Sequence, residues 1–189
     1  MTRLARFALL CLASVAALAA AGCGNKHEIV TVAETEGIYI TVDQLKYQIQ
    51  ISRILDPASP EDQAYLHGIP ETEAELAEDE LWYGIFMRVE NDKDDPHQMA
   101  ETYTIHDTEG SEFEPVDLDL EQNVFAYEAH ELQPGGTLAP ELDSPASDNT
   151  IRGNLLLFKI PASSLGNRPL ELEIESPSGG DNGRINIDV

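Results

Sequence analysis

The sequence predicts an all-β protein, an antiparallel β-sandwich of about seven or eight short strands. Three observations favour this fold class. Apolar and polar residues alternate along several segments, as they do in strands with one buried face. Turn residues, mainly glycine and proline, separate these segments. Strands and helices do not follow one another in regular succession, so a parallel sheet is not expected.

The half-buried strands are predicted from strict alternation. In the first of them, four apolar residues are expected to point the same way: Leu45, Tyr47, Ile49 and Ile51. Residues 102–113 predict a hairpin whose turn is closed by Gly110. Residues 170–175 and 184–189 predict two further alternating strands.

Two segments are apolar on both faces, which is typical of strands in the centre of a sheet. These are residues 81–91 and 154–161. Because neither segment has a polar face, we expect Trp82, Phe86 and Phe158 to share one sandwich interior or its immediate rim.

An acidic insertion, residues 56–80, interrupts two strand patterns and carries nine carboxylates with no lysine or arginine. One short helix is predicted within it at about Pro60–His67, with Ser59 as its N-cap and Gly68 at its end. Since charge adds nothing to a core, we expect removal of residues 60–80 to leave a folded domain. The predicted partner-binding residues are Glu61, Asp62, Glu71, Glu73, Glu75, Glu78, Asp79 and Glu80.

The N-terminal residues 1–22 predict an export signal. Arg3 and Arg6 precede an uncharged run, residues 7–21, which is shorter than the ~20 apolar residues of a membrane-spanning helix. Small residues end this run, and Cys23 follows directly. We expect residues 23–37 to form a flexible tether and residues 38–189 to form the sandwich domain.

The run Ala20-Ala21-Gly22-Cys23 resembles the bacterial lipoprotein box, whose cysteine is lipidated and becomes the mature N-terminus. The box most often has leucine where Ala20 stands. The resemblance implies a lipoprotein signal peptide, residues 1–22, and a lipid anchor at Cys23 on the extracytoplasmic face of the cell membrane. Cys11 would leave with the leader, so no intrachain disulfide is expected. The alternative is an ordinary secreted protein cleaved near Gly22.

The charge balance excludes one class of partner. Thirty-five acidic residues against eleven lysines and arginines give a net charge of −24. Such a surface repels nucleic acid, and we expect none to bind. A salt-rich habitat and a binding surface for a protein or cationic partner both remain explanations of the acidity.

Metal binding is predicted only weakly. Calcium is considered because carboxylates recur at alternate positions, but the first group lacks the glycine and distal glutamate of an EF-hand loop. A solvated acidic face is the interpretation we favour. The two groups are Asp92, Asp94 and Asp95, and Asp117, Asp119 and Glu121. A copper site at His97 and Met99, with Met87 nearby, lacks the second histidine–methionine pair that such sites need.

Enzymatic activity is not expected. The sequence contains no G-x-S-x-G nucleophile elbow, and its histidines have no suitably spaced partner. No cofactor is implied.

Several segments together resemble a family of uncharacterised actinobacterial lipoproteins, which are similar in turn to immunoglobulin-like domains of unknown function on many bacterial lipoproteins. The resemblance covers about residues 42–174 and depends on strand order. It implies an immunoglobulin-like antiparallel β-sandwich of about 7–9 strands and transfers no activity. The segments are VDQLKYQIQISRILDP, LWYGIFMRVEN, TYTIHDTEGSEFEPV, LQPGGTLAP, GNLLLFKIP and PLELEI.

These observations favour a lipid-anchored binding protein of the bacterial cell envelope, which recruits a protein or cationic partner through the acidic insertion. A lipoprotein that binds Ca²⁺ or a small ligand is the alternative hypothesis, and an envelope enzyme is the third.

Overall fold

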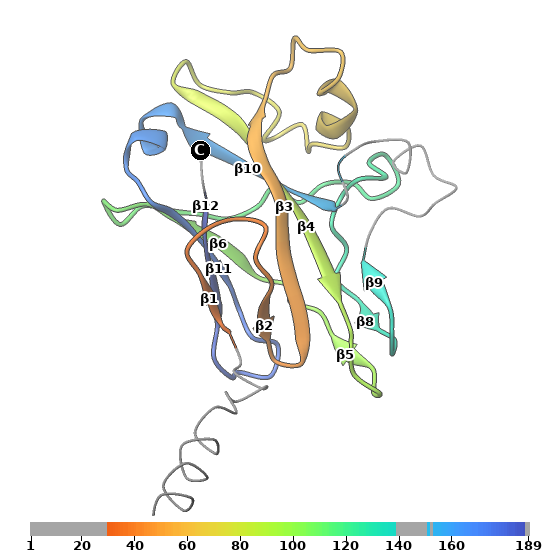
Figure 1. Cartoon of the computed structure of the whole chain (residues 1–189). Coiled ribbons are helices and arrows are strands. Elements are labelled where there is room, and N and C mark those ends of the chain that lie inside the picture. The colour runs from red at the N-terminus through yellow and green to blue at the C-terminus, as the bar shows by residue number, and fades with distance from the viewer. Residues whose placement is uncertain (1–29, 139–150, 152, 188–189) are drawn as a thin grey trace, which may run out of the picture.

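The alternating segments form two β-sheets that pack face to face (Figure 1). The computed structural model describes residues 30–138, 151 and 153–187. The first sheet has the order β1 (Val32–Ala33), β12 (Gly183–Ile187), β11 (Leu170–Ile174), β6 (Tyr103–His106) and β7 (Glu112–Phe113). The second has the order β10 (Asn154–Pro161), β4 (Glu80–Glu90), β3 (Leu45–Leu55) and β2 (Ile40–Val42), with β9 (Thr137–Leu138) also paired to β4.

The predicted fold class, a β-sandwich, is confirmed. In the described part of the chain, seven of the twelve strands have three residues or more. Among the short ones, β5 (His97–Gln98) and β8 (Glu131–Leu132) form a separate pair. The pairings are antiparallel except for β1 with β12. The predicted hairpin is β6–β7, with Gly110 at a φ of 88° in its turn.

Backbone hydrogen bonds also join the two sheets along both edges. On one side the Thr41 N–H, in β2, donates to the Val30 carbonyl just before β1 at 2.7 Å. On the other side the Val116 N–H, three residues after β7, donates to the Leu157 carbonyl of β10, also at 2.7 Å.

One face of β4 contributes its side chains to the core between the two sheets. Tyr83, Ile85, Met87 and Val89 alternate along this strand and are fully buried among residues of both sheets. Phe158 stands opposite Tyr83 in the register of β10 with β4 and is buried in the same core.

Tyrosine hydroxyls inside this core have hydrogen-bond partners. The Ala100 N–H donates to the Tyr47 hydroxyl at 2.8 Å, and the Tyr103 hydroxyl donates to that of Tyr127 at 2.6 Å. The Tyr127 hydroxyl in turn donates to the Ala100 carbonyl at 2.9 Å. Burial raises the pKa of Tyr47 to about 12, so this side chain stays neutral and the core carries no charge there.

The opposite face of β4 lies in a second apolar cluster, here called the outer cluster. Trp82 and Phe86 belong to it, so our prediction that they share an interior with Phe158 is wrong. The reason is the two-residue period of a strand, which sends Trp82 and Tyr83 to opposite faces of the sheet. The buried members are Leu55, Tyr65, Trp82, Phe86, Val116, Leu118, Ala126, Leu155 and Leu157.

A β-bulge in β3 changes which face its side chains occupy. Ile49 pairs with Met87 and Ile51 pairs with Phe86, so Gln50 is an extra residue between them. The predicted alternation therefore fails at Ile51, which is 37% exposed. Beyond the bulge, Leu55 points into the outer cluster.

Gly84, in β4, allows close packing on this outer face. A Cβ atom there would lie 3.0 Å from Leu55 Cδ1 and 3.1 Å from Leu155 Cδ1. The two leucines pack over the backbone of the strand because residue 84 has no side chain.

The helix predicted in the insertion is a single 3₁₀ turn, η2 (Gln63–Leu66). The Ser59 carbonyl accepts hydrogen bonds from the N–H groups of Asp62 and Gln63, and Gly68, with a φ of 74°, follows the turn. A second 3₁₀ turn, η4 (Ala162–Gly166), follows β10. In the part of the chain that the structure describes, no helix is long and apolar enough to cross a membrane.

Replacing Phe158 with alanine should lower the free energy of unfolding by about 3–5 kcal/mol, because a fully buried ring is lost from the core between the sheets. Urea denaturation measures this change. Val124→Ala, at a position that is 52% exposed, is the control and should change the free energy by no more than about 0.5 kcal/mol. Equal stability of the two variants would contradict the placement of β10.

Candidate functional site

The acidic insertion packs against the outer face of the second sheet. Its Tyr65 side chain is 2% exposed and lies in the outer cluster. The Tyr65 ring meets Phe86 edge to face at a centroid distance of 4.9 Å and Phe125 at 4.6 Å. The Arg53 guanidinium lies 5.7 Å from the centre of the same ring. This segment therefore completes an apolar core, and from the packing we expect its removal to destabilise the fold.

Asp62 is a structural residue of the insertion. It is 4% exposed and forms an ion pair with Arg53, and its Oδ2 accepts a hydrogen bond from the Asp56 N–H at 2.9 Å. A carboxylate buried in this way is not available to a partner. The prediction of Asp62 as a partner-binding residue is wrong, because the bulge in β3 brings Arg53 to the outer face beside it.

Most of the other predicted acidic residues do lie on the surface. Glu73 and Glu80 are half-buried, and the Glu80 carboxylate accepts a hydrogen bond from the Ala77 N–H at 2.8 Å. Among the described residues, none of the exposed carboxylates of the insertion forms an ion pair. These exposed residues are Asp56, Glu61, Glu71, Glu75, Glu78 and Asp79.

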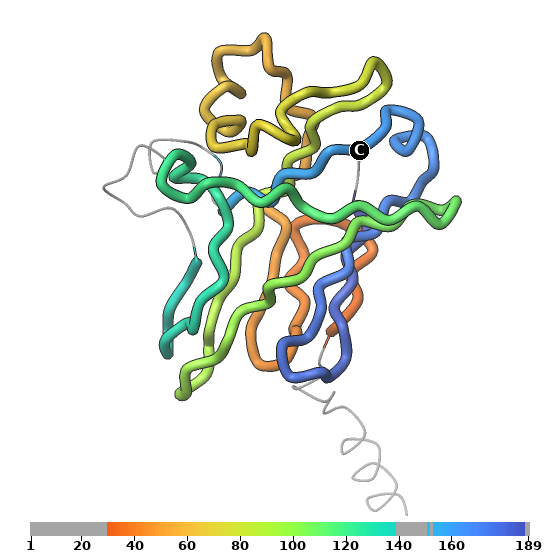
Figure 2. Tube along the Cα trace, turned by 180° about the vertical axis from the view of Figure 1, so that it is seen from behind, coloured from red at the N-terminus to blue at the C-terminus, as the bar shows by residue number. Residues whose placement is uncertain are grey.

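A second acidic segment, residues 117–123, lies beside the insertion. The Asp119 N–H donates to the Gly68 carbonyl at 2.9 Å, and the Asn123 amide donates to the carbonyls of Tyr65 and His67, each at 2.9 Å. Figure 2 shows the chain that follows β7 running across the sandwich to this contact. We call the exposed carboxylates of both segments the acidic surface. It comprises Asp56, Glu61, Glu71, Glu75, Glu78, Asp79, Asp117, Asp119 and Glu121.

The weak calcium candidates Asp92, Asp94 and Asp95 follow the end of β4, at the other end of the strand from the insertion. Asp92 forms an ion pair with Lys46 at 2.8 Å, and this hydrogen bond lowers the pKa of the carboxyl group. Within the described ranges, no three histidine, cysteine or acidic side chains come together in a way that could hold a metal ion.

The methionines considered as copper ligands are core residues. Met87 and Met99 are both fully buried between the sheets, while His97 lies half-buried in β5. Their side chains fill the apolar interior.

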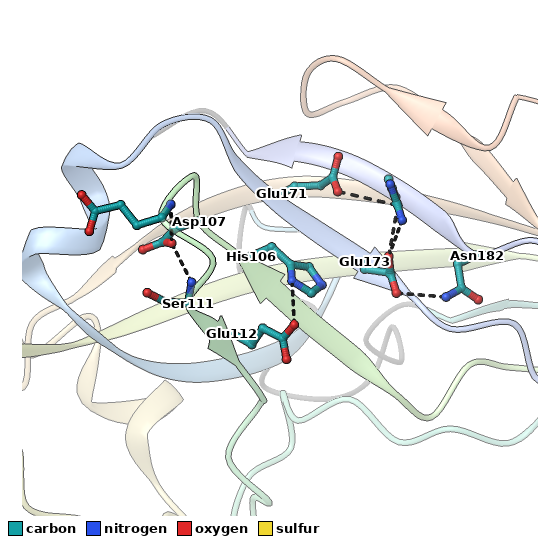
Figure 3. A network of polar contacts seen from close by, with 9 residues as sticks. His106, Asp107, Ser111, Glu112, Glu171, Glu173 and Asn182 are labelled. Atoms are coloured by element: carbon teal, nitrogen blue, oxygen red, sulfur yellow. Dashed lines mark hydrogen bonds and ion pairs between the residues drawn. The ribbon is translucent and has the colours of Figure 1, made fainter.

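The outer face of the first sheet carries a ladder of charged and polar side chains (Figure 3). Arg184 lies between Glu171 and Glu173, with nitrogen–oxygen distances of 3.7 and 3.0 Å. On the neighbouring strands, His106 Nδ1 is 3.6 Å from Glu112 Oε1. These contacts join β6 to β7 and β11 to β12, and each exposed ion pair contributes up to about 1 kcal/mol. The sequence did not predict the ladder, because its members meet only through strand register.

Asp107 organises the turn of the β6–β7 hairpin. The Asn167 amide donates to its carboxylate at 3.0 Å, and the N–H groups of Glu109 and Ser111 donate at 2.9 Å each. The hydrogen bond from Asn167 is the largest cause of a lowered pKa; together with the other bonds it outweighs burial and brings the pKa to about 2. Asp107 therefore has a structural role, in the turn.

The fold is similar to those of solved bacterial proteins at low sequence identity. The yjhA protein from Bacillus subtilis superposes with a TM-score of 0.53 and 11% identity, over 82% of this chain and 99% of that one. A functionally unknown protein from Listeria monocytogenes EGD-e gives a TM-score of 0.51 and 8% identity, over 83% and 84% of the two chains. At these identities the likeness concerns the fold alone.

A third solved structure, of the candidate lipoprotein ycdA from Bacillus subtilis, gives a TM-score of 0.45 and 14% identity, over 78% of this chain and 38% of that one. A similarity this low carries no argument about function. No protein-family model and no curated protein matches the chain.

Replacing Asp62 with alanine should lower the free energy of unfolding by about 2–3 kcal/mol, because the Arg53 charge and the Asp56 N–H lose their partner beneath the insertion. Glu71→Ala removes an exposed carboxylate of the same insertion and should cost no more than about 0.5 kcal/mol. Urea denaturation of both variants measures the difference. If Asp62→Ala is as stable as Glu71→Ala, the ion pair does not anchor the segment.

The hairpin turn should depend on pH through Asp107. Its pKa is about 2 in the folded chain, against an ordinary value of 3.8, so the ionised carboxylate stabilises the fold above that ordinary value. This stabilisation is lost as the pH falls from about 4 towards 2. The stability difference between the wild type and Asp107→Asn should therefore be larger at pH 6 than at pH 2.5. A difference that does not change with pH, measured by urea denaturation, would contradict the role of the ionised carboxylate.

Proposed function

We propose that this chain is a lipid-anchored binding protein on the extracytoplasmic face of a bacterial cell membrane, where its acidic surface recruits a basic partner. The main support for the proposal is the position of the acidic surface relative to the first described residues of the sandwich. The described chain begins beside β2 and β12, at the end of the sandwich opposite the insertion (Figure 1).

Strand β3 separates these two ends. Its eleven residues begin after the β2–β3 turn and lead to the insertion, a distance of about 35 Å in an extended strand. A tether joined to the first end holds the acidic surface away from the membrane. This orientation fits the charge of the protein, because carboxylates are repelled by anionic lipid headgroups.

The packing of the insertion also supports a binding role. The sequence suggested a segment outside the core, whereas in the structure the segment is fixed on the sheet. Tyr65 and Asp62 hold the segment on the sheet, so its exposed carboxylates are presented by a fixed backbone. A surface that is already ordered loses less conformational entropy when a partner binds.

The lipid anchor is the part of the proposal that depends on Cys23, which lies outside the described residues, as do the signal peptide, residues 1–22, and the tether up to residue 29. The support for the anchor is the order of charged, apolar and small residues before this cysteine. We also propose membership in the actinobacterial lipoprotein family, and the support for it is the order of the strand segments over about residues 42–174.

Cys23→Ala should release the protein from membranes or leave it as an uncleaved precursor, whereas the wild type should fractionate with membranes. Labelling cells with a fatty-acid probe should mark the wild type and leave Cys23→Ala unmarked. Cys11→Ala is the matched control and should be labelled like the wild type, because Cys11 lies in the leader. A wild type that takes up no fatty acid would show that the anchor is absent.

A further inference from the structure

A cleft opens on the side of the sandwich next to the acidic surface. Its volume is about 380 Å³, at the lower end of the range of about 300–1,000 Å³ that is usual for ligand sites. Nine of its twelve lining residues are apolar, and the other three are acidic. The loop residues Asp117, Leu118 and Leu120 line it, so the cleft and the acidic surface are continuous.

The cleft forms because two segments meet the same edge of β10. Pro115 forms an antiparallel bridge with Phe158, and Ala126 forms a parallel bridge with Leu155. The chain between these bridges is longer than the stretch of β10 that it spans, so it loops outward and leaves a space. Hydrogen bonds of 2.7 Å from the Val116 N–H to the Leu157 carbonyl and of 2.9 Å from the Tyr127 N–H to the Leu155 carbonyl hold the two sides apart.

The apolar part of the cleft combines buried and exposed side chains. Leu155 is 1% exposed, and Val116 and Leu118 are 8% exposed, so these residues are fixed in the outer cluster. Leu120 is 45% exposed. An exposed leucine beside a preformed apolar floor offers area to an apolar side chain of a partner.

Three carboxylates complete the lining; one comes from the β5–β6 connection and the other two from the two ends of the β7–β8 connection. They are Glu101, Asp117 and Glu128. Within the described ranges none of them forms an ion pair; Glu101 accepts one hydrogen bond, from the Gln98 amide at 3.4 Å. Carboxylates without a cation repel one another, and a positive charge in the cleft relieves this repulsion. The cleft is thus complementary to a cation that also carries apolar groups.

We propose that this cleft binds an extended segment of a partner protein in which lysine or arginine alternates with apolar residues. The proposal rests on the function proposed above and locates its specific contact. The apolar residues of the segment pack on Leu118 and Leu120. The charged ends of its lysines or arginines meet the carboxylates of Glu101, Asp117 and Glu128.

The experiment uses the full chain in phosphatidylcholine nanodiscs and a fluorescein-labelled decapeptide of alternating leucine and lysine, with binding measured by fluorescence anisotropy. A serine–lysine decapeptide of the same charge is the comparison probe. The wild type should bind the leucine–lysine peptide about tenfold or more tightly than the serine–lysine peptide, because only the former has an apolar contact.

Two sets of substitutions with equal change in charge test the location. E101Q/D117N/E128Q should weaken binding of the leucine–lysine peptide about tenfold, since three ion pairs are lost. D94N/D95N/D181N removes three exposed carboxylates elsewhere and should weaken it by less than about threefold. Leu120→Ala, at an exposed position, should weaken binding of the leucine–lysine peptide and leave that of the serine–lysine peptide unchanged.

If the two triple variants lose the same affinity for the leucine–lysine peptide, the cleft is not the binding site. A general attraction of the acidic surface for basic partners would still explain such a result. Equal affinity for the two peptides would overturn the apolar contact in the same way. If spermine competes as well as the unlabelled leucine–lysine peptide, the site is one for a free polyamine and the peptide proposal fails. If the wild type binds neither peptide, both the cleft and the proposed recruitment of a basic partner are wrong.

Discussion

Strand β4 buries side chains on both of its faces, and the rest of the structure has to cover both. On one face Tyr83, Ile85 and Met87 meet the opposing sheet, which is the ordinary interior of a sandwich. On the other face Trp82 and Phe86 would be exposed on a bare sheet, at a cost of about 1.5–3 kcal/mol for each large apolar side chain. The insertion and the segment after β7 cover this second face.

This constraint explains how a segment can be both acidic and part of the core. The insertion turns its larger apolar side chains toward the sheet and most of its carboxylates toward water. Asp62 is the exception, and the bulge at Gln50 supplies its partner by directing Arg53 to the outer face. The same packing that stabilises the fold therefore fixes the positions of the exposed carboxylates, and their arrangement is a property of the folded chain.

Local patterns in the sequence predicted the strands and the hairpin, because the two-residue period and the Asp107–Gly110 turn act over a few residues. They did not predict the bulge, since one extra residue between Ile49 and Ile51 leaves the run apolar at alternate positions. The burial of Asp62 depends on Arg53 across the insertion, and the cleft depends on two segments reaching one edge of β10. Such contacts follow from tertiary packing, which the composition of the chain and the spacing of its residues do not determine.

The intrinsic fluorescence of Trp82 tests the central claim most directly, because it is the only tryptophan and lies in the outer cluster. The full chain is compared with a variant in which a short Gly-Ser linker replaces residues 60–79, leaving β4 intact. Our account predicts that the variant loses cooperative unfolding and that its Trp82 emission shifts to the red and becomes open to acrylamide quenching. A variant that unfolds cooperatively at the wild-type temperature, with Trp82 still shielded, would contradict it.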